Sequence, residues 1–548
     1  MTNKEISRAL KLIAALGELH NENPFKLKSF TNAAFNVDRA GDALEGKPLE
    51  ELILIPGIGK SIALQIIELL ETGSTEDLRN YAAITPTGVI EMLGVKGIGP
   101  KKVATIWREL GIESPGELLY ACYENRLVDL KGFGTKTQET IRTALEYRLA
   151  NQGKLHFAEA EIVANELINL LNTLDENLSI SFTGELRRYM EVIENLELLI
   201  VSNPEYVESL LEKCEQVQIE SVLEESILIK MADKYSVCLI CCEEDQFERE
   251  QLLRTGPAEH LDELDIDPEE PIGSEKALYE DRGFPFILPE LRDLPMETSS
   301  KIDITQLVQW NSIRGILHNH STYSDGIHSL EEMAIACRDL GMEYLGICDH
   351  SKSAFYAGGL SIEKVVQQHA EIEKLNAQLA PFKILKGIES DILSDGSLDY
   401  PDEILETFDL VVASVHSILN MDIERATKRL ITAIENPYTT ILGHPTGRLL
   451  LSRKGYPIDY KKVIDACAAN DVIMELNAHP YRLDIDWRWI PYCMEKGVQI
   501  SINPDAHKKE GYSDMHYGVN VARKGGLTND FLFNGKSLNE MLTYLSNF

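Results

Sequence analysis

Seven short apolar runs lie beyond residue 310, and each leads into a histidine or an acidic residue. The runs and the residues that follow them are 313–317 with His318 and His320, 344–348 with Asp349 and His350, 382–388 with Glu389, 410–415 with His416, 440–443 with His444, 472–478 with His479, and 498–504 with Asp505 and His507. Stretches of helical periodicity, such as 330–340 and 460–470, separate the runs. This alternation predicts a parallel sheet, and barrel enzymes place their chemistry at the carboxyl ends of such strands.

The polar side chains of this region form a donor set too large for a single metal ion. Imidazole and carboxylate groups bind divalent metals, and one ion takes about four to six donors. His318 and His320 are two residues apart, so both project from one face of a strand, and Asp505 and His507 repeat that spacing. The candidate ligands are His318, His320, Asp325, His350, Glu389, His416, His444, Asp505 and His507. Such a set suits about two or three ions, which clamp both oxygens in phosphate-ester hydrolysis. The alternative is that these residues are ordinary polar caps of strands.

Four motifs of this region resemble those of PHP phosphoesterases. They are HNHSTYSDG at residues 318–326, CDHS at 348–351, GIE at 387–389 and DAH at 505–507. The resemblance implies a distorted (β/α)7 barrel with a trinuclear metal centre, in which all the candidate ligands bind metal.

Three further strings narrow the resemblance: DGSLDYPD at 395–402, GHPTGR at 443–448 and NAHPYR at 477–482. They are similar to the PHP domain that is joined to bacterial family-X DNA polymerases, and this likeness extends over the whole chain. It implies a manganese-dependent 3′→5′ exonuclease and 3′-end phosphatase, with two or three divalent ions (Mn, Zn or Fe, with Mn favoured). The expected fold class is a multidomain α/β and α chain. The expected domains are a lyase-like helix-hairpin-helix domain (1–80), a fingers-like domain (81–152), a nucleotidyltransferase-like palm (153–230), a thumb-like region with a linker (231–300) and the PHP domain (301–548).

The first 150 residues contain a repeated glycine motif. LIPGIGKS at 54–61 is echoed by GVKGIGPKK at 94–102 and by LKGFGTK at 130–136, each between helical segments. This is the helix-hairpin-helix pattern, in which glycines permit a tight turn and the next helix presents unpaired amides to a phosphate. The predicted partner is DNA. The contact is independent of base sequence, because only the phosphate backbone is bound. The candidate DNA-binding residues are Gly57, Gly59, Lys60, Gly97, Gly99, Lys101, Lys102, Gly132, Gly134 and Lys136.

The first hairpin resembles the lyase domain of family-X polymerases but lacks the reactive lysine. In lyase-active members a lysine eight positions after the first hairpin glycine forms a Schiff base. Counting from Gly57 places Gln65 there, and an amide cannot do this chemistry. We expect no lyase activity by that route, although Lys60 lies close to this position in the sequence and keeps an alternative open.

The central region resembles the polymerase palm without its catalytic acids. A glycine and two arginines of the family pattern are kept, as Gly184, Arg187 and Arg188, whereas Glu185 replaces a serine that contacts the incoming triphosphate. Where the polymerases carry three aspartates, the chain has Asn195, Glu197 and Ser236. Because two Mg²⁺ ions need bridging carboxylates, we expect no templated synthesis. The palm and thumb then serve to position DNA, or are a folded relic that packs on the barrel.

Within the barrel, the clustered metals are expected to bind one phosphate. They would lower the pKa of a bridging water and stabilise the leaving 3′ oxygen. Arg448 and Arg453, after the fifth run, are candidate phosphate clamps or plain surface charges. His479 lies outside the family's ligand positions and either orients substrate or bonds within the rim.

The preferred function is therefore 3′-end processing of DNA in repair. The expected substrates are gapped, nicked or 3′-blocked ends, bound without sequence preference. Three alternatives stay open: a working gap-filling polymerase with exonuclease, a small-molecule phosphatase of the histidinol-phosphate type, and a non-catalytic DNA-binding scaffold.

The net charge of −35 opposes binding to nucleic acid, but it is unevenly distributed. Residues 1–150 carry 18 Lys and Arg against 20 Asp and Glu, so the rest of the chain holds −33. DNA contacts are therefore expected mainly from the N-terminal part.

No apolar run approaches the ~18 residues that a membrane span needs. Cys241 and Cys242 lie in an apolar run, so reduced thiols and a cytoplasmic location are expected.

Overall fold

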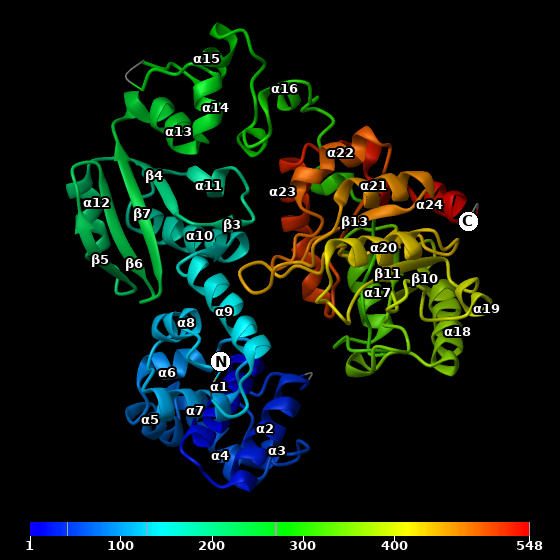
Figure 1. Ribbon diagram of the computed structural model, residues 1–548. Helices are drawn as coiled ribbons and strands as arrows, with labels where there is room; N and C mark the ends of the chain where they lie inside the picture. The colour runs from blue at the N-terminus through cyan, green and yellow to red at the C-terminus, as the bar shows by residue number, and fades with distance from the viewer. Residues whose placement is uncertain (41, 129, 269–270, 547–548) are drawn as a thin grey trace. The chain divides into compact units, whose positions relative to one another are not determined.

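The computed structural model describes residues 1–40, 42–128, 130–268 and 271–546, and the chain divides into two compact units (Figure 1). Unit 1 comprises Met1–Gln152 and unit 2 comprises Gly153–Phe548. Over the described ranges, no helix is both long and apolar enough to cross a membrane.

Unit 1 is helical. Its helices are α1 (Asn3–Leu19), α2 (Pro24–Asp38), α3 (Leu49–Leu52), α4 (Lys60–Thr72), α5 (Glu76–Ala83), α6 (Thr87–Met92), α7 (Pro100–Leu110), α8 (Pro115–Tyr123) and α9 (Thr135–Ala150). Helix α1 has apolar residues on two sides and lies at the junction of two cores. Its residues Ile6, Leu10 and Ile13 pack with α2 and α4, whereas Leu16 and Leu19 pack with α7 and α8.

Each predicted glycine hairpin precedes a helix whose first turn has no side-chain cap. Gly59, Gly99 and Gly134 are the N-cap residues of α4, α7 and α9, and none of these caps has a side chain that accepts an amide hydrogen bond. Two residues earlier, Gly57, Gly97 and Gly132 have φ angles of 78°, 95° and 87°. These left-handed turns require glycine, and they leave the helix amides available to an anion.

The first part of unit 2 is a mixed sheet covered by helices. The strand order is β2 (Ser179–Phe182), β4 (Glu197–Val201), β7 (Tyr235–Cys242), β6 (Ser226–Met231) and β5 (Val217–Val222), and only β4 and β7 run parallel. Helices α10 (Phe157–Leu174) and α12 (Pro204–Leu211) bury their apolar residues on this sheet. A short ribbon joins β1 (Leu155–His156) to β3 (Val192–Ile193), and α11 (Gly184–Arg187) follows β2. Helices α13 (Phe247–Thr255), α14 (Ala258–Glu263), α15 (Glu275–Asp281) and α16 (Met296–Ser299) lead to the barrel.

The barrel is a seven-stranded parallel sheet in simple sequence order. Its strands are β8 (Gly315–Ile316), β9 (Tyr344–Ile347), β10 (Lys383–Asp391), β11 (Leu410–Ser414), β12 (Ile441–Leu442), β13 (Ile473–Asn477) and β14 (Ile500–Asn503). A bridge between Asn319 and Ala506 brings the first and last strands together at their carboxyl ends. The buried Asn534 side chain also donates to the carbonyls of Gly315 (3.1 Å) and Ile502 (2.8 Å), so it spans the same seam. The nearly closed barrel confirms the expected fold class.

Helices lie between and after the strands of the barrel, and several of them begin at polar side-chain caps. They are α17 (Leu330–Asp339), α18 (Ile362–Leu379), α19 (Asp402–Leu405), α20 (Ile423–Ile434), α21 (Tyr460–Ala469), α22 (Ile490–Glu495), α23 (Met515–Lys524) and α24 (Leu538–Leu545). Ser329 with Glu332 forms a capping box on α17, and Ser361, Asp422 and Asp459 cap α18, α20 and α21. Each cap satisfies an otherwise unpaired first-turn amide.

The barrel interior changes from apolar to polar along the strands. Leu385, Val412 and Ile473 belong to an inner cluster that Phe533 and Met541 of the C-terminal segment also join. Because side chains alternate between the two faces of a strand, Ile473 and Glu475 share the inner face of β13. The carboxyl half of the barrel is therefore lined by polar groups, and this is where the candidate ligands lie.

Candidate metal centre and nucleic-acid interface

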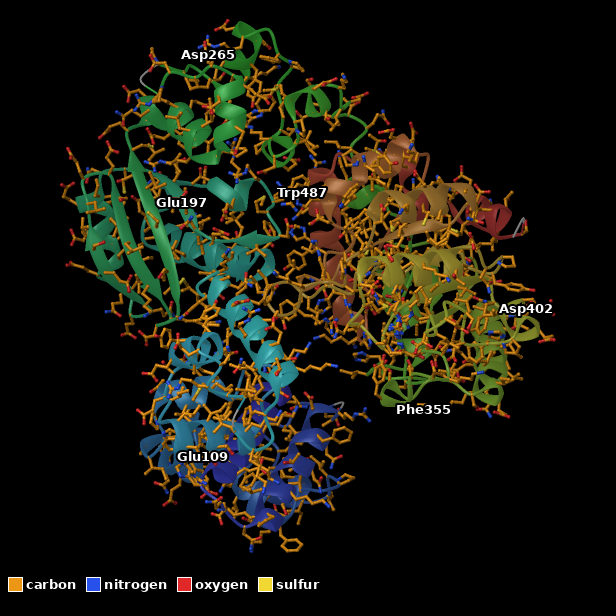
Figure 2. The ribbon with its side chains drawn as sticks, in the orientation of Figure 1. Glu109, Glu197, Asp265, Phe355, Asp402 and Trp487 are labelled. Carbon is orange, nitrogen blue, oxygen red and sulfur yellow. The ribbon has the colours of Figure 1, made fainter. Side chains whose placement is uncertain are left out.

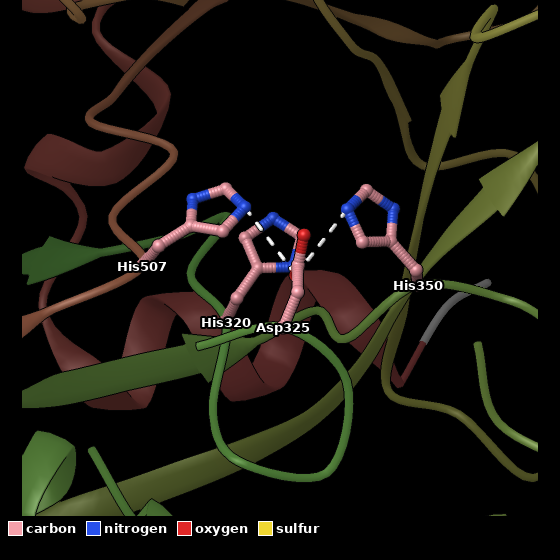
Figure 3. Close-up of side chains that lie close together, drawn as sticks. All are labelled: His320, Asp325, His350 and His507. Carbon is pink, nitrogen blue, oxygen red and sulfur yellow. Dashed lines mark ion pairs between the residues drawn. The ribbon is translucent and has the colours of Figure 1, made fainter. Parts of the chain in front are cut away.

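All nine candidate ligands lie together at the carboxyl ends of the barrel strands. They form four overlapping groups, and the possible ligand atoms within each group lie within 4.8 Å of one another. The groups are His320, Asp325, His350 and His507; His318, Glu389 and His444; His318, His320 and Asp505; and His350, Glu389 and His416. Figure 3 shows Asp325 with the imidazoles of His320, His350 and His507 around it, and its Oδ1 lies 3.4 Å from His507 Nε2. Glu389 belongs to two groups, so one carboxylate could bridge two ions.

Three of these residues have an unusual backbone conformation that turns them into the barrel. His318, His444 and Asp505 have φ angles of 57°, 22° and 53°, in the left-handed region that residues with a side chain seldom adopt. Each follows the end of a strand, so the chain leaves the sheet at that residue. Strain of this kind persists only where the surroundings enforce it, and it is concentrated at functional sites.

Buried carboxylates outside the nine orient the histidines. Glu475 Oε1 lies 2.6 Å from His318 Nδ1, and its Oε2 accepts the backbone N–H of His444 at 2.6 Å. Asp391 Oδ1 lies 2.6 Å from His416 Nδ1. In each case the carboxylate fixes one ring nitrogen and directs the other to the cluster, which is the usual support for a metal-bound histidine.

Asp349 organises the loop that carries Asp325. Its carboxylate accepts hydrogen bonds from the backbone and hydroxyl groups of Ser321 and Ser324, and from Gln368 Nε2 at 2.6 Å. The side chain is fully buried, and burial raises the pKa of its carboxyl. Asp349 thus holds the loop that carries Asp325 in place without belonging to the donor groups.

Charges within the cluster depend strongly on one another. Burial disfavours the protonated form of His318, but Glu475, Glu389 and Asp505 hold its pKa well above the ordinary value. Burial and the neighbouring His507 and His350 lower the pKa of His320 to about 3. Burial also opposes ionisation of Glu389, yet the surrounding histidines hold its pKa well below the ordinary value. The acidic groups are therefore ionised, which is the form that binds cations.

Several buried atoms in the cluster suit a metal better than a hydrogen bond. Among the described residues, His318 Nε2, His320 Nδ1, His350 Nδ1, His444 Nδ1 and Glu389 Oε2 have no hydrogen-bond partner although they are buried. Burying such groups costs free energy unless something coordinates them. The donor chemistry and these unsatisfied atoms both fit divalent ions.

Arg448 does not fit its predicted role as a phosphate clamp. Its guanidinium donates to the carbonyls of Arg482 and Leu483 and, at 2.9 Å, to Asp486. All three nitrogens are thereby committed to the barrel, so we withdraw this prediction. Arg453 donates through Nε and Nη2 to the Gly447 carbonyl and keeps its role only as a prediction.

Arg482 is the cation that sequence reasoning missed. Its Nε lies 3.7 Å from Asp505 Oδ2, and its side chain is only partly buried. Since Arg482 ends the NAHPYR string, its place after a buried strand was the available signal. His479, in the same loop, accepts the backbone N–H of Tyr481 through Nδ1 at 3.2 Å, which agrees with the rim bond considered for it.

The hairpin lysines of unit 1 are solvent-accessible. Lys60, Lys101 and Lys136 are exposed, and Lys102 is partly exposed with its ammonium 5.4 Å from the centre of the Phe133 ring. Gln65, at the position of the lyase lysine, donates to Asp77 Oδ2 at 3.0 Å.

The polymerase-like residues of the palm bind one another and the helices that follow. Glu185 Oε2 accepts the backbone N–H groups of Glu194 (2.6 Å) and Asn195 (3.1 Å). Arg187 pairs with Glu275 at 2.6 Å and Arg188 with Asp293 at 3.0 Å. Both arginines are thus held in ion pairs within unit 2.

Comparisons with known proteins identify the family. Residues 1–75 match the helix-hairpin-helix domain, residues 89–146 the SAM-like helix-hairpin-helix tandem, and residues 317–479 the PHP domain. The DNA polymerase/3'-5' exonuclease PolX of Bacillus subtilis (strain 168) is 34% identical over 100% of this chain and 99% of its own length. The chain belongs to the PolX family. The expected family is therefore confirmed, together with its helix-hairpin-helix and PHP parts.

Other relatives of this PolX family member match a smaller part of the chain. A probable phosphatase of Thermoanaerobacter sp. (strain X514) is 29% identical over 40% of this chain and 88% of its own length. A probable phosphatase of Acetivibrio thermocellus is 30% identical over 35% of this chain and 78% of its own length.

Proposed function

We propose that this PolX family member is a metal-dependent phosphoesterase that removes nucleotides or phosphate from the 3′ ends of DNA. The main observation in support is that the nine donors lie together in four overlapping groups, two of which include Glu389. We assign two or three divalent ions to them and favour manganese over zinc or iron. The name of the full-length relative, a polymerase and 3'-5' exonuclease, supports a DNA substrate.

The residues of the chain divide the work between binding and orientation. When bound, divalent ions would polarise a phosphate ester and acidify water. Glu475 and Asp391 hold His318 and His416 in orientation, and Arg482 is placed to pair with a phosphate oxygen beside Asp505. The hairpins of unit 1 supply sequence-independent contacts to the DNA backbone.

We further propose that the palm does not catalyse synthesis. Asn195 and Ser236 carry no charge, and Glu185 caps the turn at Asn195 where a triphosphate would need a donor. Burial raises the pKa of Glu197, the one remaining acid, which weakens it further as a Mg²⁺ ligand.

The test uses DNA labelled at its 3′ end, Mn²⁺ and the full chain. Release of labelled mononucleotides or phosphate, lost in His318→Ala/His320→Ala, is the expected result. Silence of the unaltered protein on DNA would leave a small-molecule phosphatase or a DNA-binding scaffold. In parallel, a gapped duplex with dNTPs should show no extension, and extension that persists in the double variant would restore the polymerase.

A small-molecule phosphatase is the second candidate, because two barrel relatives are named probable phosphatases. Comparing kcat/KM for a free phosphomonoester and for a 3′-phosphorylated oligonucleotide separates the two. Preference for the oligonucleotide supports the first proposal, and turnover of the monoester alone supports the second.

A further inference from the structure

The loops that surround the metal centre carry large exposed apolar side chains. Phe355 and Tyr356, between β9 and α18, are 88% and 61% exposed, and Phe355 is labelled in Figure 2. Ile327, Ile418 and Tyr481, each 45–49% exposed, lie on the loops after β8, β11 and β13. All these loops follow the carboxyl ends of strands, which is the edge of the barrel where the nine donors lie.

The loop that displays Phe355 is firmly anchored. Its neighbours Ala354 and Ala357 are buried, at 0% and 2% exposure. Ala357 N–H and Gly359 N–H both donate to the Ala354 carbonyl, at 3.0 and 3.1 Å, and close a tight turn. The aromatic pair is therefore presented to solvent by a fixed backbone, which lowers the entropy lost when a ligand is bound.

The same loop is connected to the donors. Ser353 Oγ donates to Asp391 Oδ2 at 2.7 Å, and the other oxygen of Asp391 contacts His416. The ring centre of Tyr356 lies 6.1 Å from that of His350 and 6.5 Å from that of His416. The Tyr356 ring therefore lies beside two of the donor histidines, and Phe355 is its neighbour in the chain.

A strained residue lies on the loop after β11. Ile418, two residues after His416, has a φ angle of 54° and is 49% exposed. A β-branched residue rarely adopts this conformation, and the surroundings must impose it. Ile418 offers a second apolar contact at the entrance, after a different strand.

We propose that Phe355, with Tyr356, is a stacking platform for the terminal bases of an unpaired DNA 3′ end. This rests on the proposed exonuclease function and names the residues that would hold the end of its substrate. Every base has a π-face, so stacking on aromatic rings holds any sequence. Arg482 supplies a cation for the accompanying phosphate.

The test compares Phe355→Ala with the unaltered full chain on single-stranded DNA and Mn²⁺. Stacking on one ring contributes about 1–3 kcal/mol, so KM should rise by roughly fivefold to 150-fold with little change in kcat. Phe355→Trp should restore KM, because it restores a ring. On an oligonucleotide whose terminal nucleotides lack bases, Phe355→Ala and the unaltered protein should have the same KM.

Val366→Ala is the matched control, since Val366 is 64% exposed on α18 and lies outside the loop. Metal content by elemental analysis should be equal in all variants. An unchanged KM in Phe355→Ala, or an equal loss on the base-free substrate, would overturn the platform while leaving the exonuclease intact. An unaltered protein that hydrolyses no DNA at all would instead overturn the proposed function.

Discussion

Glu475 joins two of the nine donors through one carboxylate, since it contacts His318 Nδ1 and the backbone N–H of His444. Glu475→Gln keeps the shape of the side chain and removes its charge. We expect the affinity for Mn²⁺ to fall by about 10–100-fold, as it does when such supporting carboxylates are lost. Calorimetric Mn²⁺ titration measures this effect. Glu406→Gln, at an exposed position of the barrel, should leave the affinity unchanged. Equal affinities in both variants would contradict the assigned role.

The burial of His260 predicts that the free energy of unfolding depends on pH. It is buried, its Nε2 lies 2.6 Å from Tyr279 Oη, and burial lowers its pKa to about 4. The unfolded chain, with a histidine pKa of about 6.5, binds a proton first as pH falls. Stability is therefore complete above about pH 6.5 and declines toward pH 4, by up to about 3 kcal/mol. Urea unfolding at pH 7 and pH 5 should show this loss, and His260→Gln should reduce it. A pH dependence unaltered in His260→Gln would assign the loss to other groups.

At single positions, sequence reasoning found groups that follow apolar runs and missed charges inside them. Eight of the nine candidate donors come after a strand or on the loop beyond it, and Glu389 lies near the carboxyl end of β10, so the pattern marked them. Glu475 lies within β13, where a charged residue reads as an interruption of the run, although only a buried partner could stabilise it there. Arg448 was misjudged because its carbonyl partners, Arg482 and Leu483, belong to a loop more than thirty residues away.

Among the elements, the strands were predictable and their ends were not. The runs 313–317 and 440–443 form strands of two residues each, β8 and β12. Soon after each of them, His318 and His444 adopt left-handed backbone angles and direct the chain out of the sheet. Hydrophobic periodicity indicates which residues are buried. Residues that stay buried after the last backbone hydrogen bond of a strand show the same pattern, so the pattern does not locate the end of the strand.

The second hairpin offers a test at this scale. Gly97 has a φ angle of 95°, and an added Cβ would lie 3.2 Å from Thr140 Cγ2. Gly97→Ala should distort the turn before α7 and weaken binding to duplex DNA by about tenfold, with a shallower salt dependence because fewer phosphates are contacted. Fluorescence anisotropy at several salt concentrations measures both effects. Gly116→Ala, with no atom within 4 Å of the new Cβ and no positive φ, is the control. Equal binding by both variants would exclude this hairpin from the DNA contact.

Across unit 2, buried charges connect the palm to the barrel. Glu191, in the palm, accepts Trp487 Nε1 at 2.9 Å and Arg488 Nη1 at 3.3 Å. Lys524 of α23 is fully buried and donates to the Arg188 carbonyl at 2.9 Å. The ion pair of Arg188 therefore continues into the barrel through Asp293 and Lys524, so the predicted palm supports the barrel structurally. Loss of the Glu191 contacts would affect the loop that carries Arg482.

Glu191→Ala tests that task. The change leaves the buried indole N–H of Trp487 without its acceptor, which costs about 1–3 kcal/mol and should loosen the loop of residues 479–488. Hydrogen exchange of this loop should quicken by about tenfold, and kcat/KM for DNA hydrolysis should fall, while DNA affinity, supplied by the hairpins, stays constant. Glu194→Ala is matched to it, because Glu194 lies three residues away, is exposed and pairs with Lys154. If both variants exchange and hydrolyse alike, the palm only packs against the barrel, because a positioning role requires the loop to respond to Glu191 alone.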